Sequence, residues 1–402
     1  MPASAHVDGA PVRTSGAVNY PISMSTPHVT LALLVLSAGG PLPLATAQTP
    51  RTGDSVPTNL YAAAGAGMLG PAARRAAPLV YVPNSKDSSV SVIDPRTYRV
   101  VRTFATGALP QHVVPSYDLA TLWVANNLGN TLTPIDPVTG REGTRVPVDD
   151  PYNLYFTVDG RFAIVVAERL RRLDFRDAHT MHLIESVPVE CRGVDHMEFT
   201  ADGRYALATC EFSGQLLKLD VAARKVVGYL MLDPDGLGAR AMPQDIRASP
   251  DGRVFYVADM MANGVYLVDP DEFRRVGFVA TGKGTHGIYP SRDGRRMYIT
   301  NRGWNTTAGG RRGPGTVTVL DPITQRIVVT WPVPGGGSPD MGNVTADGRE
   351  LWLSGRYDGE VYVFDAGTGR LMHRIKVGRE PHGLCVWPQP GRYSLGHTGN
   401  MR

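Results

Sequence analysis

The chain has 402 residues, which is enough for two ordinary domains or for one large all-β domain. Charged residues make up 19% and aromatic residues 8%, while 45 glycines and 32 prolines favour many short strands with tight turns over long helices. The formal net charge of +4 is small and the basic residues are scattered. A nucleic-acid surface needs a basic stripe, so we expect no nucleic-acid partner.

The N-terminal segment has the features of an export signal. The apolar run VTLALLVL over residues 29–36 is too short to span a bilayer, which takes about twenty residues. It precedes Ala-Thr-Ala at 45–47, a pattern typical of signal-peptidase cleavage before Gln48. We predict a signal peptide over residues 1–47, with translation starting at Met24, and a periplasmic or secreted protein. The alternative is a disordered N-terminus with a chance apolar run.

After the signal, composition and cysteine usage describe an exported protein without a membrane span. Residues 48–78 are rich in Ala, Pro and Gly, which predicts a linker. No Cys-x-x-Cys-His motif is present, so covalent c-type haem is excluded. Cys191 and Cys210 flank an Asp-Gly hairpin at 202–203, which predicts a disulfide between adjacent strands. Two separate small core residues are the alternative.

From residue 79 onward one pattern of strands recurs seven times. Its first strand reads VYVPN, LWVAN, AIVVAE, ALATCE, FYVAD, MYITN and LWLSG. Its second strand ends at an aspartate, namely Asp94, Asp136, Asp174, Asp220, Asp269, Asp321 and Asp365. We interpret these aspartates as Asx-turn residues that bind their own backbone. Two further strands follow, which predicts four-stranded propeller blades.

Most units turn at an Asp-Gly corner before the next repeat begins. These corners are Asp159-Gly160, Asp202-Gly203, Asp251-Gly252, Asp293-Gly294 and Asp347-Gly348, with Asp118-Leu119 as a variant. Asp-Gly between apolar strands predicts a hairpin, because both central residues of a type I′ turn need positive φ.

The two ends of the repeat region predict how the ring closes. The first unit starts at Val80 with the strand that would be second from the axis in a complete blade, and no innermost strand precedes it. The last unit is followed by an additional innermost strand, His382–Trp387. We therefore predict an all-β, seven-bladed β-propeller over residues 79–391, closed by the C-terminal strand pairing into the first blade. Closure removes the exposed edges of an open sheet. Residues 392–402 are predicted to be a tail packed across one face.

The triplets YVPN, WVAN, YVAD and YITN, with VSVIDP, TVTVLDP and PHG, resemble the YVTN-repeat β-propellers, the YncE-like proteins. That family is grouped with the haem-binding propeller of periplasmic nitrite reductases and with lactonase-type propellers. The resemblance covers residues 79–391 and implies the fold. It implies function only coarsely, since the family includes surface, periplasmic, binding and a few enzymatic members.

The starts of the innermost strands carry an all-polar ring. Seven residues before each Asp-Gly corner, with one inserted residue allowed in the last unit, lie Gln111, Tyr152, Asp195, Gln244, His286, Asp340 and His382. One residue further along lie His112, Asn153, His196 and Asp245. Because equivalent positions of a closed ring lie at one height, we predict that these side chains form a ligand site at the channel mouth.

Ring closure places three of these residues on consecutive blades. His286, Asp340 and His382 would supply two imidazoles and a carboxylate, a competent set for a transition metal or for the iron of a noncovalent haem. The alternative is that the polar residues cap strand ends and bind channel water. An insertion at 302–315 would lie on the same face, where Trp304, Arg311 and Arg312 would cover the mouth and attract an anion.

Three functions remain open from the sequence. The first is a monomeric exported propeller that binds a small molecule or a protein partner, as an accessory to a redox or cofactor pathway. The second is an enzyme on the same scaffold, either a lactonase-like hydrolase or an oxidoreductase with noncovalent haem or metal. The third is a structural scaffold. No nucleophile-and-base motif is present, so we assign no catalytic residue.

Overall fold

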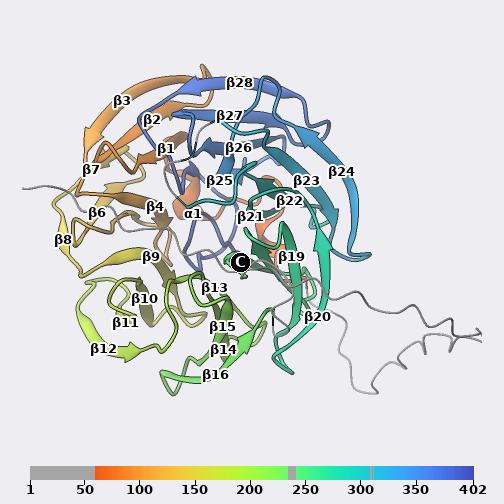
Figure 1. Ribbon diagram of the computed structural model, residues 1–402. Helices are drawn as coiled ribbons and strands as arrows, with labels where there is room; N and C mark the ends of the chain where they lie inside the picture. Colours follow the sequence, from red (N-terminus) through yellow and green to blue (C-terminus); the bar gives the residue numbers. More distant parts are fainter. Residues whose placement is uncertain (1–58, 234–240, 308–309, 311) are drawn as a thin grey trace, which may run out of the picture. The chain divides into compact units, whose positions relative to one another are not determined.

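The computed structural model describes residues 59–233, 241–307, 310 and 312–402, and all further structural statements concern these residues (Figure 1). The predicted signal peptide lies outside them. The chain forms seven β-sheets arranged as blades around one axis. None of the helices is long and apolar enough to cross a membrane.

Six blades contain four antiparallel strands, and blade 2 contains five, because its last two strands, which are short, both pair with its third strand. From the axis outward, blade 1 contains β29 (Cys385–Trp387), β1 (Leu79–Asn84), β2 (Ser89–Asp94) and β3 (Arg99–Ala105). In the same order, blade 2 contains β4 (Pro110–Pro115), β5 (Leu122–Asn126), β6 (Thr131–Asp136) and the short β7 (Arg141–Glu142) and β8 (Val146–Pro147). Blade 3 contains β9 (Pro151–Phe156), β10 (Phe162–Ala167), β11 (Arg172–Asp177) and β12 (Leu183–Pro188). Blade 4 contains β13 (Val194–Phe199), β14 (Tyr205–Cys210), β15 (Gln215–Asp220) and β16 (Lys225–Met231).

The remaining three blades repeat this arrangement. Blade 5 contains β17 (Pro243–Ala248), β18 (Phe255–Asp259), β19 (Gly264–Asp269) and β20 (Arg274–Ala280). Blade 6 contains β21 (Thr285–Pro290), β22 (Met297–Asn301), β23 (Thr316–Asp321) and β24 (Arg326–Pro332). Blade 7 contains β25 (Pro339–Val344), β26 (Glu350–Gly355), β27 (Glu360–Asp365) and β28 (Leu371–Lys376).

The core lies between blades because alternate residues of a strand face opposite sides of its sheet. In β1, Val80 and Val82 pack in one apolar cluster with Trp352 of blade 7. Tyr81, between them, packs in another cluster with Val113 of blade 2. Both faces of every inner strand are therefore buried, which explains runs of Val, Ile and Leu in place of a strict apolar–polar alternation.

The C-terminal strand closes the ring, as the sequence predicts. β29 pairs antiparallel with β1, with Leu79 opposite Trp387 and Tyr81 opposite Cys385. The backbone of His382 continues this edge by donating its N–H to the carbonyl of Pro83 at 3.1 Å. Blade 1 thus combines strands from both ends of the repeat region (Figure 1).

The Asp-Gly corners are hairpin turns, but their geometry differs from the predicted type I′. Gly160 has φ +70°, whereas Asp159 is not among the residues with positive φ. The Asp159 carboxylate instead accepts the hydroxyl of Thr157 at 2.6 Å and the N–H of Arg161 at 3.1 Å. Only the glycine needs the left-handed conformation, and the aspartate stabilises the turn with its side chain.

In the third unit the predicted strand-end aspartate is the wrong residue. Asp174 lies in the middle of β11, where its buried carboxylate pairs with Arg172 at 2.8 Å and Arg176 at 3.3 Å. The turn residue is Asp177, which accepts the backbone N–H groups of His179 and Thr180 at 3.1 and 2.8 Å. This is the Asx-turn that the other strand-end aspartates were expected to make.

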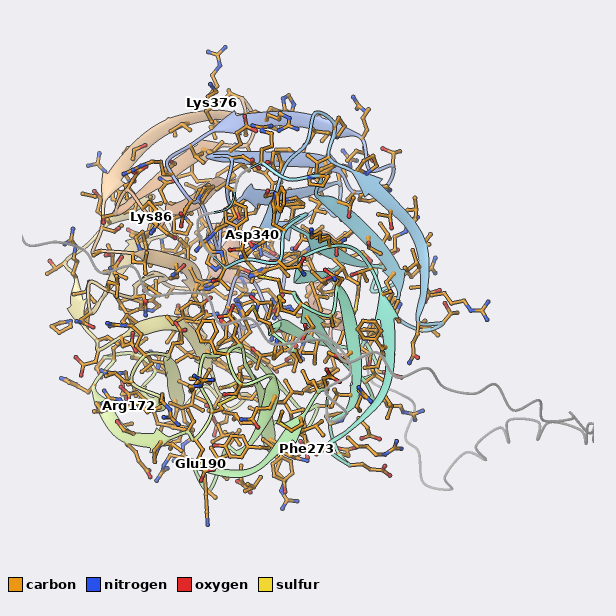
Figure 2. The ribbon with its side chains drawn as sticks, in the orientation of Figure 1. Lys86, Arg172, Glu190, Phe273, Asp340 and Lys376 are labelled. Carbon is orange, nitrogen blue, oxygen red and sulfur yellow. A yellow bond between two sulfur atoms is a disulfide. The ribbon has the colours of Figure 1, made fainter. Side chains whose placement is uncertain are left out.

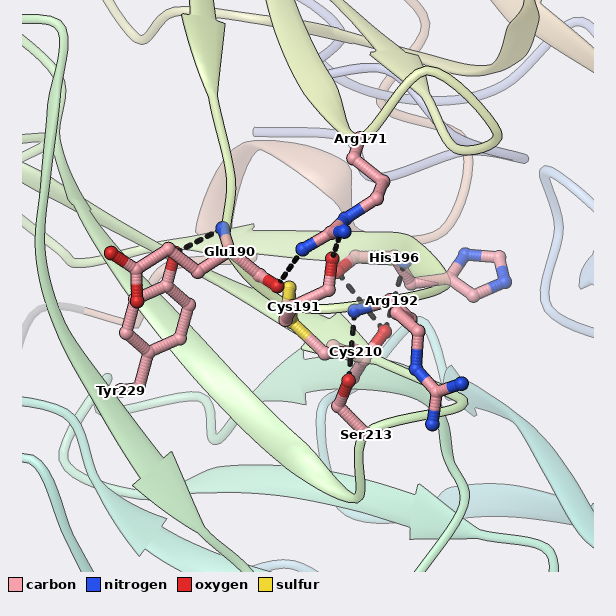
Figure 3. The surroundings of a disulfide bond; sticks show 9 residues. Arg171, Glu190, Cys191, Arg192, His196, Cys210, Ser213 and Tyr229 are labelled. Carbon is pink, nitrogen blue, oxygen red and sulfur yellow. Dashed lines mark hydrogen bonds between the residues drawn. A yellow bond between two sulfur atoms is a disulfide. The ribbon is translucent and has the colours of Figure 1, made fainter.

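Cys191 and Cys210 are joined by a disulfide, with their Cα atoms 5.9 Å apart (Figure 3). Cys210 ends β14, and Cys191 lies in the loop that leads into β13. The third cysteine, Cys385, is free and buried in β29. The bond therefore ties the entry of an innermost strand to its neighbour.

Two segments outside the repeats pack against the propeller. Residues 59–78, predicted to be part of a linker, contain a 3-10 helix (Ala62–Ala64) and α1 (Pro71–Arg74) and bind the corner face, for example through Leu60 N–H to the carbonyl of Pro250 at 2.7 Å. The C-terminal tail enters the ring, whereas the prediction had it packed across one face. Ser394 to Thr398 are all buried, and Figure 1 shows the C-terminus near the centre of the ring.

Candidate functional site at the channel mouth

The predicted polar ring occupies one structural position. Gln111, Tyr152, Asp195, Gln244, His286 and Asp340 are the second residues of β4, β9, β13, β17, β21 and β25. His382 lies three residues before β29, in the extended segment that pairs with β1. Innermost strands all start at the same face, so these side chains come to one end of the channel. Figure 2 shows Asp340 near the ring centre.

A cavity of about 140 Å³ opens at this end of the channel. Five ring residues line it, namely Gln111, Tyr152, Gln244, His286 and His382. The other lining residues are Glu168, Glu211, Phe212, Arg302, Thr307 and Arg356. The cavity therefore has mostly polar walls and a size suited to a small molecule.

Asp340 connects the two predicted histidines. His382 Nδ1 donates to Asp340 Oδ2 at 2.6 Å, and His286 Nδ1 lies 3.0 Å from Oδ1. Arg302, which the ring alignment did not include, donates from Nε to Oδ1 at 2.7 Å. It also contacts His286 Nε2 at 2.7 Å, which fixes the neutral tautomer of that ring with its proton on Nδ1.

The charges in this group follow from burial and from the arginines. Burial would raise the pKa of Asp340, but Arg302, followed by His286 and Arg356, holds it below its ordinary value. Burial, followed by Arg302, lowers the pKa of His286 well below its ordinary value. Burial, followed by Arg356, does the same to the pKa of His382. The group is therefore an ionised carboxylate and a guanidinium with two neutral imidazoles.

This arrangement bears on the metal predicted at His286, Asp340 and His382. The three side chains do converge, but the Arg302 guanidinium already supplies the positive charge beside the carboxylate. A metal ion would have to displace a buried cation with two contacts to Asp340. We place no metal at this trio.

The opposite wall of the cavity is acidic. Burial, followed by the neighbouring Glu211, raises the pKa of Glu168 to about 8. Burial also raises the pKa of Glu211, against a hydrogen bond that its carboxylate accepts from Gln244 at 2.9 Å. Asp195 behaves in the same way, since burial, then Glu211 and Glu168, raise its pKa well above its ordinary value. Glu168 therefore holds its proton at neutral pH.

Sequence alignment on the Asp-Gly corners missed the charged residues that follow the second strand of each blade. That position is occupied by Ser85, Asn127, Glu168, Glu211, Met260, Arg302 and Arg356 in blades 1 to 7. The signal was available, because each of these residues lies at the C-terminal end of the YVTN-like motif: Glu168 and Glu211 are its last residue, and the others directly follow it. Acidic residues thus occupy blades 3 and 4, and basic residues occupy blades 6 and 7.

The insertion at 302–315 contributes fewer residues to the channel mouth than predicted. Thr307 lines the cavity, whereas the Trp304 ring lies beside the Lys283 ammonium at 5.2 Å. Arg312 pairs with Glu360 at 3.0 Å, and neither residue lines the cavity. Arg311 lies outside the described residues. Tyr152 and Gln111 line the cavity at its rim. Asn153 and Asp245, each one position further along its strand than a ring residue, are buried deeper in the channel.

The family model of the YncE-like β-propellers matches residues 55–391. The chain belongs to the YncE-like β-propeller family. Its fold, a β-propeller, is the one that this family has. No curated protein matches its sequence.

Solved structures show that this YncE-like propeller shares its fold with proteins of different functions. The periplasmic gluconolactonase PpgL of Pseudomonas aeruginosa is 18% identical, with a TM-score of 0.62 over 78% of this chain and 99% of that one. The dihydro-heme d1 dehydrogenase NirN is 17% identical, with a TM-score of 0.56 over 76% and 74%. The hydrazine synthase of Kuenenia stuttgartiensis is 18% identical, with a TM-score of 0.57 over 68% and 88%. At these identities the likeness shows the fold alone.

The described mouth cavity does not fit a haem. Pockets for drug-sized ligands measure about 300–1,000 Å³, whereas this cavity measures about 140 Å³. Its histidines are also held by Asp340 and Arg302. We therefore derive no chemistry through haem.

Proposed function

We propose that this YncE-like propeller binds a small zwitterion at the channel mouth. The observation that carries the proposal is the separation of acidic from basic residues across the cavity. Glu168 and Glu211 line one side from blades 3 and 4, and Arg302 and Arg356 line the other from blades 6 and 7. A ligand with an ammonium and a carboxylate group matches both walls at once.

The basic wall has one arginine with capacity to bind a carboxylate. Arg302 is engaged with Asp340, but Arg356 has weaker contacts, with Ser85 Oγ at 3.4 Å and with Glu380 at 3.9 Å. Its Nε has no hydrogen-bond partner among the described residues, although the side chain is buried. A guanidinium binds a carboxylate through two parallel hydrogen bonds, which would satisfy this buried donor.

The acidic wall would respond to the other end of the ligand. Burial raises the pKa of both Glu168 and Glu211, and the Glu211 charge adds to the effect at Glu168. An ammonium group placed between them would favour the ionised forms. The ligand would therefore displace a proton from this wall and gain a charge-assisted hydrogen bond.

Calorimetric titration with short ω-amino acids, and with the matched amine and carboxylic acid that lack one charge, tests the proposal. We expect the best amino acid to bind at least about tenfold tighter than either analogue, since a hydrogen bond to a charged group contributes about 1.5–3 kcal/mol. Arg356→Met should remove the preference over the amine, and Glu211→Gln the preference over the acid. Arg379→Met, at an exposed ion pair, is the control. Equal binding of all three compounds, or none, would contradict the proposal.

We also propose that the protein is exported. The predicted cleavage before Gln48 supports this, as does the disulfide between Cys191 and Cys210, because such bonds persist in oxidising compartments. N-terminal sequencing of protein recovered from the periplasm or medium should begin at Gln48. Recovery of uncleaved protein in the cytoplasm would contradict export.

A hydrolase of small esters or lactones is the second candidate. The His382–Asp340 hydrogen bond of 2.6 Å favours it, because His382 lines the cavity and a carboxylate orients its ring. Such a pair activates water as a general base, and Arg302 would stabilise the developing oxyanion. A lactone panel should then give turnover that His382→Ala lowers about 100-fold or more. Turnover that survives this change would exclude the role.

A further inference from the structure

Deeper in the channel, three histidines meet that belong to different parts of the chain. His112 comes from β4, His196 from β13 and His397 from the C-terminal tail. Their ring centroids are 5.3, 5.3 and 4.6 Å apart, and all three side chains are fully buried. One ring nitrogen of each lies within 4.8 Å of those of the other two. These three residues, the histidine triad, lie beneath the mouth cavity, with the His112 ring 4.8 Å from that of His382.

The histidine triad has nitrogens that the described residues leave without a hydrogen bond. Both ring nitrogens of His112 are unpartnered, as are Nε2 of His196 and Nε2 of His397. Asp195 Oδ1 lies 3.2 Å from His196 Nε2, and Asp245 Oδ1 lies 3.6 Å from His397 Nε2, but neither contact has hydrogen-bond geometry. Buried polar groups without partners are rare and costly, so four such nitrogens on three adjacent rings indicate a ligand.

The protonation state suits a metal. Burial lowers the pKa of all three histidines well below the ordinary value, and the neighbouring histidines or Arg247 add to the effect. Neutral imidazole is the form that binds metal. Asp195 and Asp245 bring carboxylate oxygens close enough to provide further ligands.

We propose that His112, His196 and His397 bind one divalent transition-metal ion. Three imidazoles are a set that zinc and copper prefer, whereas calcium and magnesium require mainly oxygen ligands. A fourth position would be taken by a carboxylate or by a molecule from the cavity above. This site differs from the trio predicted from the sequence and does not rest on the proposed zwitterion binding.

Glycines make room for two of these rings. A Cβ on Gly383 would lie 2.1 Å from His112 Nδ1, so only glycine allows this ring its place. Gly396 has φ +96°, and a Cβ there would lie 2.3 Å from the carbonyl of Leu154. That close approach lets His397 N–H donate to the same carbonyl at 2.9 Å, which anchors the third imidazole on blade 3.

Asn153 links two members of the histidine triad. Its amide nitrogen lies 3.2 Å from His196 Nδ1 and 3.1 Å from His397 Nδ1. Its amide oxygen accepts the backbone N–H of Leu154 at 2.9 Å, which holds the amide nitrogen beside both rings. Asn153 is therefore a positioning residue, and such residues change metal affinity about 10- to 100-fold when removed.

Metal titration of the full chain tests the proposal. The protein is treated with a chelator, dialysed, and titrated with Zn²⁺ by calorimetry and with Co²⁺ by visible absorption, and a Cu²⁺ titration distinguishes the two preferred ions. We expect one ion per chain, d–d bands of low-symmetry Co²⁺, and a Zn²⁺-dependent rise in melting temperature. His397→Ala and His196→Ala should each lower affinity at least about 100-fold, and Asn153→Ala about 10- to 100-fold. His182→Ala, at an exposed histidine, should change nothing.

The outcomes separate a built site from surface binding. Absence of binding to the wild type, or equal binding by His397→Ala and the wild type, would overturn the proposal. If a single alanine variant does not fold, the wild-type melting shift and Co²⁺ spectrum still decide. Removal of zwitterion binding by Arg356→Met, with the metal retained, would leave the metal site standing, so the two proposals fail separately.

Discussion

At the scale of single residues, Arg302 provides the positive charge that pairs with the buried carboxylate of Asp340 at the channel mouth. It is buried and pairs with Asp340, which is itself fully buried. Removing one partner of a buried pair leaves an uncompensated charge, which costs about 3–5 kcal/mol. Arg302→Met should lower the free energy of unfolding by about this amount in urea denaturation.

A matched set of variants separates the charge from the loss of packing. Arg302→Met combined with Asp340→Asn removes both charges and should be less destabilising than the sum of the two single changes. Arg349→Met, at an exposed pair with Asp347, should change stability by less than about 1 kcal/mol. Additive effects of the two buried changes would show that the pair is not coupled.

Glu168 gives the stability of the protein a pH dependence. Its folded pKa of about 8 lies above the ordinary value of 4.5, so the folded state holds a proton that the unfolded chain releases in this window. The contribution is fully present below about pH 4.5 and is lost as pH rises through 8. Glu168→Gln should therefore flatten the fall in unfolding free energy between these pH values.

Urea denaturation at several pH values measures this slope. Glu211 will retain part of it, because burial raises its pKa in the same direction. Glu190→Gln, on the exposed loop before β13, is the control. An identical pH profile for Glu168→Gln and the wild type would contradict the assignment.

The sequence predicted the inner ring at the residue scale because its members share one offset from a recognisable corner. The charged residues after the second strands share an offset too, but from a different motif, so they were missed. His397 has no equivalent in any repeat. Its place depends on the path of the tail, which positive φ at Gly396 and Gly399 directs, and no periodic pattern reports that path.

At the scale of elements, the disulfide fixes the entry of β13. It joins residues 19 apart, and a bond that closes a loop of this size contributes about 2–4 kcal/mol, mainly by restricting the unfolded chain. Cys191→Ala with Cys210→Ala should lower the free energy of unfolding by about this amount. Addition of a reductant should lower the wild type to the same value and leave the double variant unchanged. Two free thiols at these positions in non-reducing peptide maps would contradict the bond.

Elements were predictable where their turn chemistry repeats. Asp-Gly corners and strand-end aspartates identify hairpins, because each turn satisfies its own backbone through one carboxylate. The third unit departs from this rule, since the buried ion pairs of Asp174 place a second aspartate inside β11. Sequence alone cannot distinguish a turn aspartate from a paired one that lies three residues earlier.

At the scale of the whole molecule, closure and channel filling are separate tasks of the C-terminal region. β29 completes blade 1, and the residues after it occupy the channel. Asn400 and Arg402 both donate to the buried Glu198 carboxylate, at 3.0 and 2.8 Å. Closure followed from counting strands, whereas the filled channel did not, because the tail resembles an ordinary polar terminus.

Two truncations test this division. Deletion of residues 394–402 leaves β29 paired with β1, so the propeller should remain folded and soluble by circular dichroism. Its melting temperature should fall, because the buried contacts of residues 394–402 are lost, including the two hydrogen bonds that Asn400 and Arg402 donate to Glu198. Deletion of 381–402 removes the strand as well, leaves blade 1 with an exposed inner edge, and uncovers apolar faces next to blades 7 and 2. This longer deletion should aggregate or lose its cooperative transition, since one missing strand opens the whole ring. An equal melting temperature for the two truncations would mean that β29 does not close the ring, and the argument for a shared mouth at blades 6, 7 and 1 would fail with it.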